Sequence, residues 1–115
     1  MIDRPELHDY LAFFEAEPKI IDPHARWCCG TEFVSVRGRD RIVATIAPDD
    51  GEFKFQWWQD TVLRANLKMQ GIVDWSLDCN AKQETLLLKF NQPGIVYFSL
   101  QLKPDISFSW ITSWA

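Results

Sequence analysis

The chain has 115 residues, of which 47% are apolar and 14% are aromatic, and its net charge is −4. This length and composition predict one folded domain over residues 1–115 and exclude a disordered chain. No run approaches the roughly 20 apolar residues that a membrane-spanning helix needs, so no membrane partner is expected.

The expected location is the cytoplasm. The first residues are charged and are interrupted by Pro5, unlike the apolar stretch of a secretory signal. The three cysteines, Cys28, Cys29 and Cys79, are odd in number, and two of them are adjacent. They make a poor disulfide framework, which is typical of a protein in a reducing compartment.

Negative charge is concentrated near the N-terminus. Residues 1–22 contain six acids and two bases, whereas residues 23–115 contain ten of each. Non-specific affinity for phosphate depends on clustered lysine and arginine, and these are not in excess. Duplex nucleic acid is therefore not an expected partner.

Residues 3–17 are predicted to form a helix. Asp3 can cap its start, Pro5 suits its first turn, and Pro18 ends it. Apolar residues at helical spacing form one stripe for packing on a sheet: Leu7, Tyr10, Leu11 and Phe14. A different face carries three acids and one aromatic residue: Glu6, Asp9, Glu17 and Phe13.

Residues 18–24 are expected to be a connector, and beyond them the apolar pattern changes to alternation, which predicts strands. The predicted strands cover residues 32–37, 41–47, 52–58, 72–79, 84–91, 96–102 and 106–110. Turns are expected at residues 38–40, 48–51, 80–81, 92–94 and 103–105. Residues 61–70 lie between Asp60, which could cap a helix, and Gly71, which could end one, but their alternation has no error and favours a strand.

Together these elements predict an α+β fold. The N-terminal helix would pack on a curved, mostly antiparallel sheet of about seven strands, arranged as a meander or a half-barrel.

Motifs for catalysis, for metal binding and for phosphate binding are missing from the sequence, and no cofactor is expected. A thiol–imidazole pair would need Cys28 or Cys29 beside His24, but we expect these cysteines to behave as small apolar residues. Adjacent cysteines on a strand point to opposite faces and do not readily share a zinc ion. The basic cluster at residues 37–41 could grip a phosphate or a carboxylate, although charge that solubilises a hairpin tip explains it more simply.

Tryptophan is abundant, with six residues in the chain. Trp57 and Trp58 are consecutive on a predicted strand, so their side chains must point to opposite faces. Trp57 continues the face of Phe53 and Phe55, which makes Trp58 the expected surface residue. Trp114 is a second candidate for exposure.

The leading functional hypothesis is an inhibitor that neutralises a basic protein by direct complex formation. Bacterial immunity proteins and phage-encoded inhibitors of nuclease toxins or nucleic-acid-binding machines are often compact, acidic and free of catalytic motifs. An acidic surface accelerates encounter with a basic target. The expected contact residues are Glu6, Asp9, Phe13, Glu17 and Trp58.

Two alternatives remain open at this point. One is a binding module with a pocket between helix and sheet for an apolar ligand or a sugar. The other is an enzyme whose acid/base site follows no known motif, which a deep pocket with two converging acids would favour. The oligomeric state is left open.

Overall fold

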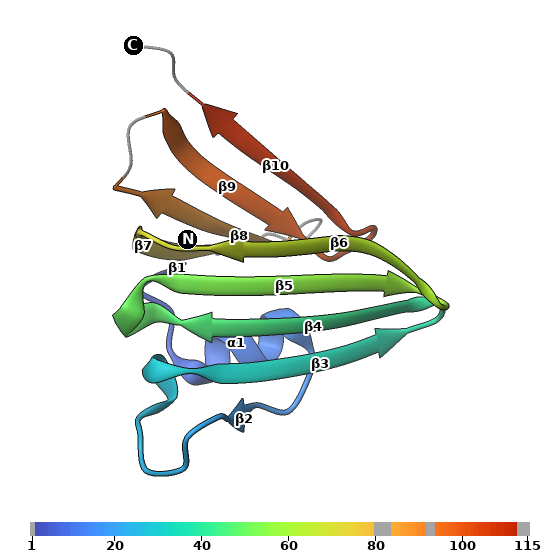
Figure 1. Cartoon of the computed structure of the whole chain (residues 1–115), viewed down its shortest axis with the longest axis horizontal. Coiled ribbons are helices and arrows are strands. Elements are labelled where there is room, and N and C mark those ends of the chain that lie inside the picture. The colour runs from blue at the N-terminus through green and yellow to red at the C-terminus, as the bar shows by residue number, and fades with distance from the viewer. Residues whose placement is uncertain (1, 80–83, 92–93, 113–115) are drawn as a thin grey trace.

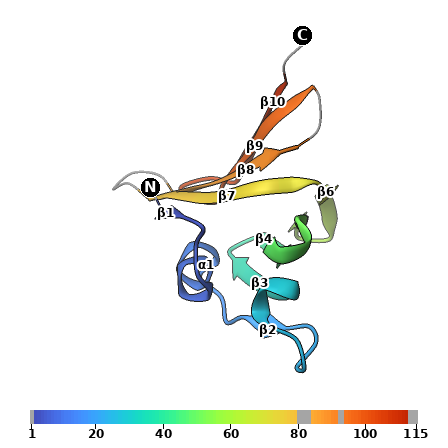
Figure 2. The ribbon, with the colours of Figure 1, turned by 90° about the vertical axis from the view of Figure 1, so that its left-hand side faces the viewer.

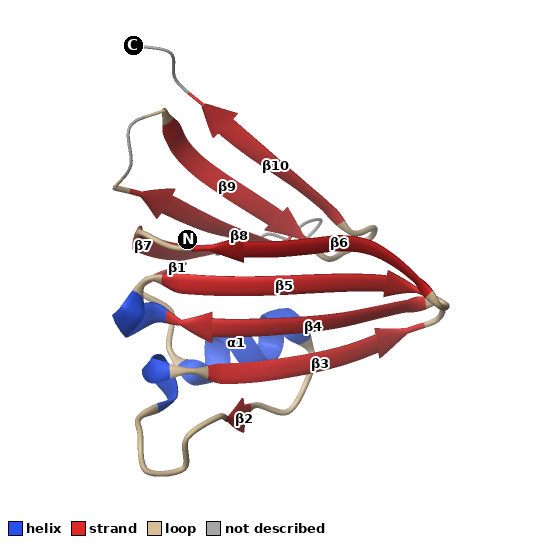
Figure 3. Cartoon of the chain, in the orientation of Figure 1, coloured by secondary structure: helices blue, strands red, loops and turns tan. Residues whose placement is uncertain are grey.

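The computed structural model describes residues 2–79, 84–91 and 94–112, and these form mainly β-strands (Figures 1 and 3). The described helices are α1 (Leu7–Phe14) and two short 3₁₀ helices, η1 (Trp27–Cys29) and η2 (Pro48–Asp50). The strands are β1 (Ile2–Asp3), β2 (Lys19–Ile20), β3 (Thr31–Arg37), β4 (Asp40–Ala47), β5 (Glu52–Gln59), β6 (Val62–Met69), β7 (Ile72–Cys79), β8 (Glu84–Phe90), β9 (Ile95–Gln101) and β10 (Ser107–Thr112).

The strands form two antiparallel sheets of five strands each. The first sheet has the order β2-β3-β4-β5-β6, and the second has the order β1-β7-β8-β9-β10. Neither sheet is closed or strongly curled. The predicted N-terminal helix and antiparallel pairing are confirmed, but the single curved sheet of about seven strands is wrong.

The two-sheet arrangement follows from how much apolar surface the strands present. An eight-residue helix such as α1 is only about 12 Å long and cannot cover a broad sheet. The inner faces of the two sheets instead cover each other, with Phe53 against Phe98 and Phe55 against Phe108, both at ring-centroid distances of 6.4 Å. α1 lies in the opening between the sheets (Figure 2), where Phe14 stacks on Phe33 of the first sheet.

Most strand boundaries agree with the sequence. The hairpin of β3 and β4 is confirmed, and residues 62–69 form a strand, β6, as their alternation predicts. Gly51 ends the predicted turn at residues 48–51 with a left-handed φ of 66°. The predicted connector at residues 18–24 contributes the short strand β2. The predicted turn at residues 80–81, most of the turn at residues 92–94, and Trp114 lie outside the described residues.

The helix is shorter than predicted. Ile2 and Asp3 pair with β7 instead of starting the helix, so Asp3 is not its cap. Glu6 occupies the N-cap position, and its backbone N–H donates to Oδ2 of Asp9 at 2.8 Å, half of a capping box. The helix ends at Phe14 because Glu15 adopts a left-handed conformation (φ 52°), three residues before Pro18.

Phe13 corrects one prediction about the helix surface. The sequence placed it among the exposed acids, but it is 1% exposed and belongs to the core, where its ring contacts Phe14 edge to face. Leu11, predicted to be part of the buried stripe, is 36% exposed. The reason is that α1 is covered by two sheets rather than one, which widens and rotates its buried side.

Within the described residues, no helix has the length and apolar character needed to cross a membrane.

Candidate functional site

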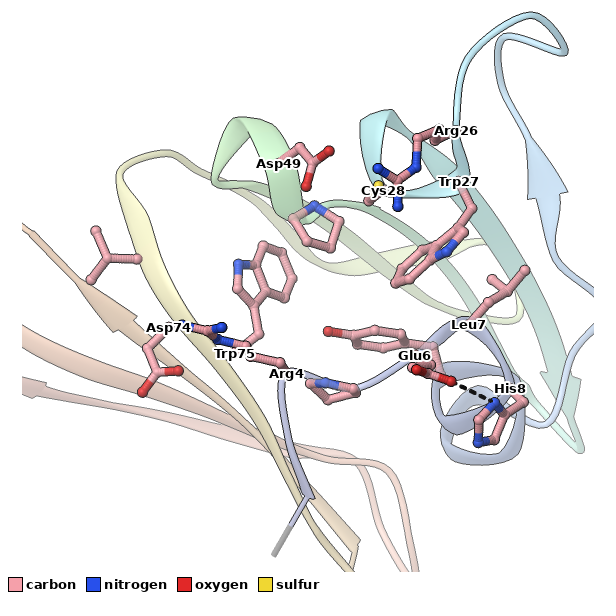
Figure 4. A pocket seen from close by; sticks show the side chains of 14 residues that line it. Arg4, Glu6, Leu7, His8, Arg26, Trp27, Cys28, Asp49, Asp74 and Trp75 are labelled. Atoms are coloured by element: carbon pink, nitrogen blue, oxygen red, sulfur yellow. Dashed lines mark ion pairs between the residues drawn. The ribbon is translucent and has the colours of Figure 1, made fainter.

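Figure 4 shows the residues that line a cleft of about 820 Å³. It is lined by segments that are far apart in the sequence: residues 4–8 with Tyr10, residues 26–28, residues 48–49 and residues 73–75. In that order, the four segments lie at the start of α1, at η1, at η2 and on β7. The cleft therefore lies where the helix meets both sheets.

Strand pairing explains why these segments converge. η1 precedes β3 and η2 follows β4, so the antiparallel β3–β4 hairpin brings the two short helices to the same end of the first sheet. On the other wall, the backbone N–H of Arg4 donates to the carbonyl of Trp75 at 3.1 Å. Arg4 has a positive φ of 52°, and the chain turns there from β1 into α1. Such a backbone is uncommon for a residue with a side chain.

Aromatic rings from three elements meet at the cleft. Tyr10 lies 5.9 Å from Trp27 and 6.5 Å from Trp75, measured between ring centroids, and the Trp75 contact is edge to face. Burial raises the pKa of the Tyr10 phenol, and the charge of Asp9 raises it further. The Tyr10 hydroxyl therefore stays protonated at neutral pH and remains a hydrogen-bond donor.

Two polar atoms on these rings have no partner. The Tyr10 hydroxyl and Trp75 Nε1 are buried, and neither makes a hydrogen bond to any residue that the structure describes. Most buried polar groups in proteins are hydrogen-bonded, and leaving one unpaired costs about 1–3 kcal/mol. Both residues line the cleft, and the two donor atoms lie just beneath its floor, with almost no accessible surface of their own.

The acids of the cleft already have partners. Oε2 of Glu6 lies 3.7 Å from Nδ1 of His8, and Oδ2 of Asp74 lies 4.0 Å from Nζ of Lys89. The carboxylate of Asp49 beside the Cys28 thiol, together with burial, raises the pKa of Cys28.

The two arginines of the cleft differ from the acids. Arg4 and Arg26 are exposed at its rim, and neither forms an ion pair with another residue in the described ranges. Arg4 lies on the wall of Trp75, and Arg26 lies on the opposite wall beside Asp49 (Figure 4). The cleft thus has unpaired donors at its rim as well as just beneath its floor.

The arrangement does not resemble a nucleophilic site. A reactive cysteine needs a lowered pKa, and that of Cys28 is raised. His24, the other half of the thiol–imidazole pair considered above, does not line the cleft. Asp49 and Asp74 both line it, but from opposite walls rather than as a converging pair (Figure 4). Among the described residues, no group of three or more potential ligands is placed to hold a metal ion.

The structure separates the contact residues expected from the sequence. Glu6 lies at the cleft with a side chain that is 76% exposed, and Glu17 is exposed beyond the end of α1. Asp9 takes part in the capping box, and its side chain is 16% exposed. Phe13 is in the core. Only Glu6 of this set lines the cleft.

Trp58 lies on a second surface, which we call the outer face. This is the side of the first sheet turned away from the core, because its residues alternate with buried ones such as Phe53 and Phe55. Val36, Arg41, Trp58 and Leu63 form one row across β3, β4, β5 and β6. Trp58 itself is half-buried, whereas Val36 is 67% exposed.

The acids near the N-terminus do not form one free patch. Asp22 accepts the backbone N–H of His24 at 2.9 Å, and Glu15 forms an ion pair with Lys103. With Glu6 and Asp9 in the capping box, four of the six acids in residues 1–22 have local structural roles.

Sequence reasoning missed four residues of the cleft: Arg4, Tyr10, Arg26 and Trp75. Tyr10 was assigned to the packing stripe, which is correct for its ring but says nothing about its hydroxyl. Whether a buried donor has a partner depends on its neighbours in β7 and the two 3₁₀ helices. These segments are distant in the sequence, so no local pattern predicts the contacts.

One solved structure resembles this chain over nearly its whole length. It is a chain of a contact-dependent growth inhibition toxin–immunity protein complex from Klebsiella pneumoniae 342, with a TM-score of 0.74, 95% of both chains covered and 12% sequence identity. At this identity the similarity shows a shared fold. No protein-family model and no curated protein matches the sequence.

Proposed function

We propose that this chain is an immunity-type protein, which binds a toxin domain directly and thereby neutralises it. The observation that carries the proposal is the fold shared with a chain of a toxin–immunity complex, with 95% of each chain covered. The match spans both chains almost completely, so the likeness is between two whole folds rather than one common hairpin or helix.

The cleft favours the role of inhibitor over the role of toxin. A toxin that acts as an enzyme needs groups poised to take or give protons or to attack a substrate. In this cleft Asp49 lies beside the Cys28 thiol, whose pKa it raises, and Glu6 and Asp74 lie next to His8 and Lys89. The unpaired donors are suited to holding an acceptor group of another molecule.

Glu6 and Glu17 are the proposed electrostatic contacts with a basic partner. Both have exposed carboxylates near α1, where they can speed encounter with a basic partner. Asp9 and Phe13 are left out because the Asp9 side chain is only 16% exposed and Phe13 fills the core. Trp58 does not line the cleft, and it would be the anchor only if the partner bound the outer face instead of the cleft.

The test begins with the genes next to the one that encodes this chain, where we expect a toxin domain that this chain neutralises. We expect co-production to restore growth of cells that make the toxin, and the purified pair to bind with a Kd in the nanomolar range. Changing Glu6 and Glu17 to lysine should slow association, with the largest effect at low salt. The toxin of the Klebsiella complex is the non-cognate control.

Two outcomes would contradict the proposal. One is a folded chain that neither protects cells nor binds the neighbouring toxin at micromolar concentration. The other is protection by a chain that never forms a complex with the toxin.

The cleft volume favours a second candidate, a small-ligand binding module. At about 820 Å³ the cleft falls within the range of roughly 300–1,000 Å³ that is common for ligand sites. A saturable rise in the melting temperature with one member of a panel of sugars, nucleotides and lipids would support it. The absence of any shift would leave protein binding as the better explanation.

A further inference from the structure

We propose that the cleft binds a carboxylate group of the partner protein, the side chain of one aspartate or glutamate. This inference rests on the proposed function, because it names the group that an immunity-type protein would recognise there. It is carried by two buried donors without partners, Tyr10 Oη and Trp75 Nε1, just beneath the floor of a cleft whose rim has two unpaired guanidinium groups. A small movement of the side chains above them brings these donors to the ligand.

The four groups share one chemical requirement. An indole N–H and a guanidinium can only donate hydrogen bonds, and a protonated phenol donates as well. None of the four groups has a hydrogen-bond acceptor or an ion-pair partner among the residues described here. A ligand that satisfies them must therefore bring lone pairs rather than further donors.

The acids that line the cleft limit the charge of that ligand. Glu6, Asp49 and Asp74 lie around the same opening, and each would repel a negatively charged ligand. This repulsion is larger for a ligand with two negative charges than for a ligand with one. A phosphate carries up to two charges, whereas a carboxylate carries one. A neutral carbonyl would leave Arg4, on the wall that carries Trp75, without an opposite charge. A carboxylate also has the planar pair of oxygens that guanidinium groups bind in a forked geometry.

Backbone structure holds the donors in place before any ligand arrives. The N–H of Arg4 is bonded to the carbonyl of Trp75, which ties the rim arginine to the strand that carries the indole. Tyr10 contacts Trp27 and Trp75, so its ring is fixed between two others. A pre-ordered set of donors loses little conformational entropy on binding, which favours affinity.

A carboxylate site does not require the partner to have a net negative charge. A basic toxin can present one acid, which enters the cleft, while basic residues around it face Glu6 at the rim. Such an arrangement places opposite charges together at both positions, and it would reject a toxin that lacks the acid.

The decisive variant is Tyr10→Phe, which removes only the hydroxyl. Because the hydroxyl is buried without a partner, the variant should melt at the wild-type temperature or above it. Its Kd for the cognate toxin should be at least tenfold weaker. Tyr97→Phe is the matched control, since Tyr97 is half-buried on β9 and does not line the cleft, and it should change neither quantity.

Arg4→Gln tests the rim in the same way. We expect at least a tenfold weaker Kd and a smaller dependence of affinity on salt, whereas Arg64→Gln, on β6, should leave both unchanged. Aspartates and glutamates of the toxin are then changed singly to asparagine and glutamine. One of them should show strong non-additivity with Arg4→Gln in a double-mutant cycle. If every acid of the toxin is additive with Arg4→Gln, the proposal is overturned.

A second measurement needs no toxin and separates this inference from the proposed function. The indole N–H resonance of Trp75, assigned by its loss in Trp75→Phe, is followed while sodium acetate is added to the wild-type chain. A saturable shift that Tyr10→Phe weakens supports a carboxylate site even if the toxin does not bind. A response to inorganic phosphate at lower concentration than to acetate would overturn the carboxylate assignment, and no response to either would overturn the site.

Discussion

The cleft and the outer face are the two surfaces on which this protein could meet a partner, and they are built differently. The cleft is enclosed by segments from both sheets and the helix, and it presents polar atoms without partners. The outer face belongs to one sheet, and it presents exposed apolar side chains such as Val36 and Leu63.

The two surfaces also differ in how much they destabilise the unbound protein. Scattered apolar residues on a sheet surface are common and cost little. Buried donors without partners destabilise the fold, and they persist where something other than stability maintains them. This contrast is why we place the contact in the cleft, and it can be tested through stability as well as through binding.

The largest expected effect comes from Phe13→Ala. Phe13 holds α1 between the sheets and is 1% exposed. Removing its ring should lower the free energy of unfolding by about 3–5 kcal/mol, because a large aromatic residue leaves a cavity. Denaturation in urea measures the change, with Leu11→Ala as the exposed control on the same helix. Near wild-type stability for Phe13→Ala would return Phe13 to the list of contact residues.

Two glycines allow the ends of the molecule to be compared directly. Gly51 follows η2, which forms one wall of the cleft, and a Cβ there would lie 2.7 Å from the carbonyl oxygen of Ile72. Gly38 lies in the β3–β4 turn, and a Cβ there would meet nothing within 4 Å. Both residues have positive φ. We expect Gly51→Ala to cost about 2–4 kcal/mol and Gly38→Ala about 1 kcal/mol.

Binding of the cognate toxin by these two variants sharpens the comparison further. Gly51→Ala should weaken the complex, because it displaces the backbone that carries Pro48 and Asp49. Gly38→Ala should leave the Kd unchanged. Equal losses of stability at the two positions would show that the clash at Ile72 is relieved without displacing the cleft wall.

Trp58→Ala addresses the outer face itself. Trp58 is half-buried at the surface and does not line the cleft, so its loss should lower stability by only about 1 kcal/mol and change the Kd less than twofold. Surface plasmon resonance with the cognate toxin measures the second quantity. A Kd more than tenfold weaker would place the contact on the outer face, because exposed tryptophans often anchor interfaces.

The sequence predicts the elements better than it predicts their assembly. Alternation correctly identifies β6, and the turn residues identify the β3–β4 hairpin, because both signals are local. The division into two sheets is not local. It depends on β1 pairing with β7 across most of the chain.

The candidate site, like the fold, was predicted only where the signal is local. Glu6 is visible in the sequence as an acid on a helix, and the structure does place it at the cleft. Tyr10 and Trp75 are visible only as apolar residues. Their roles arise where β7 passes the start of α1, and the sequence gives no measure of that distance.

The smallest expected effect lies at the far end of α1 from the cleft, where Glu15 pairs with Lys103. The hydrogen bond from Lys103 lowers the pKa of Glu15. A lowered pKa in the folded state stabilises the protein above the unfolded pKa of about 4.3, and this contribution disappears as the pH falls through the folded pKa. Glu15→Gln should therefore be less stable than the wild type at pH 7 and equally stable near pH 2. Because the pair is exposed, the difference at pH 7 should be only a few tenths of a kcal/mol. Urea denaturation of both proteins from pH 7 to pH 2 measures this difference in stability. A difference that persisted at pH 2 would mean that Glu15 acts through its left-handed backbone position rather than through its charge.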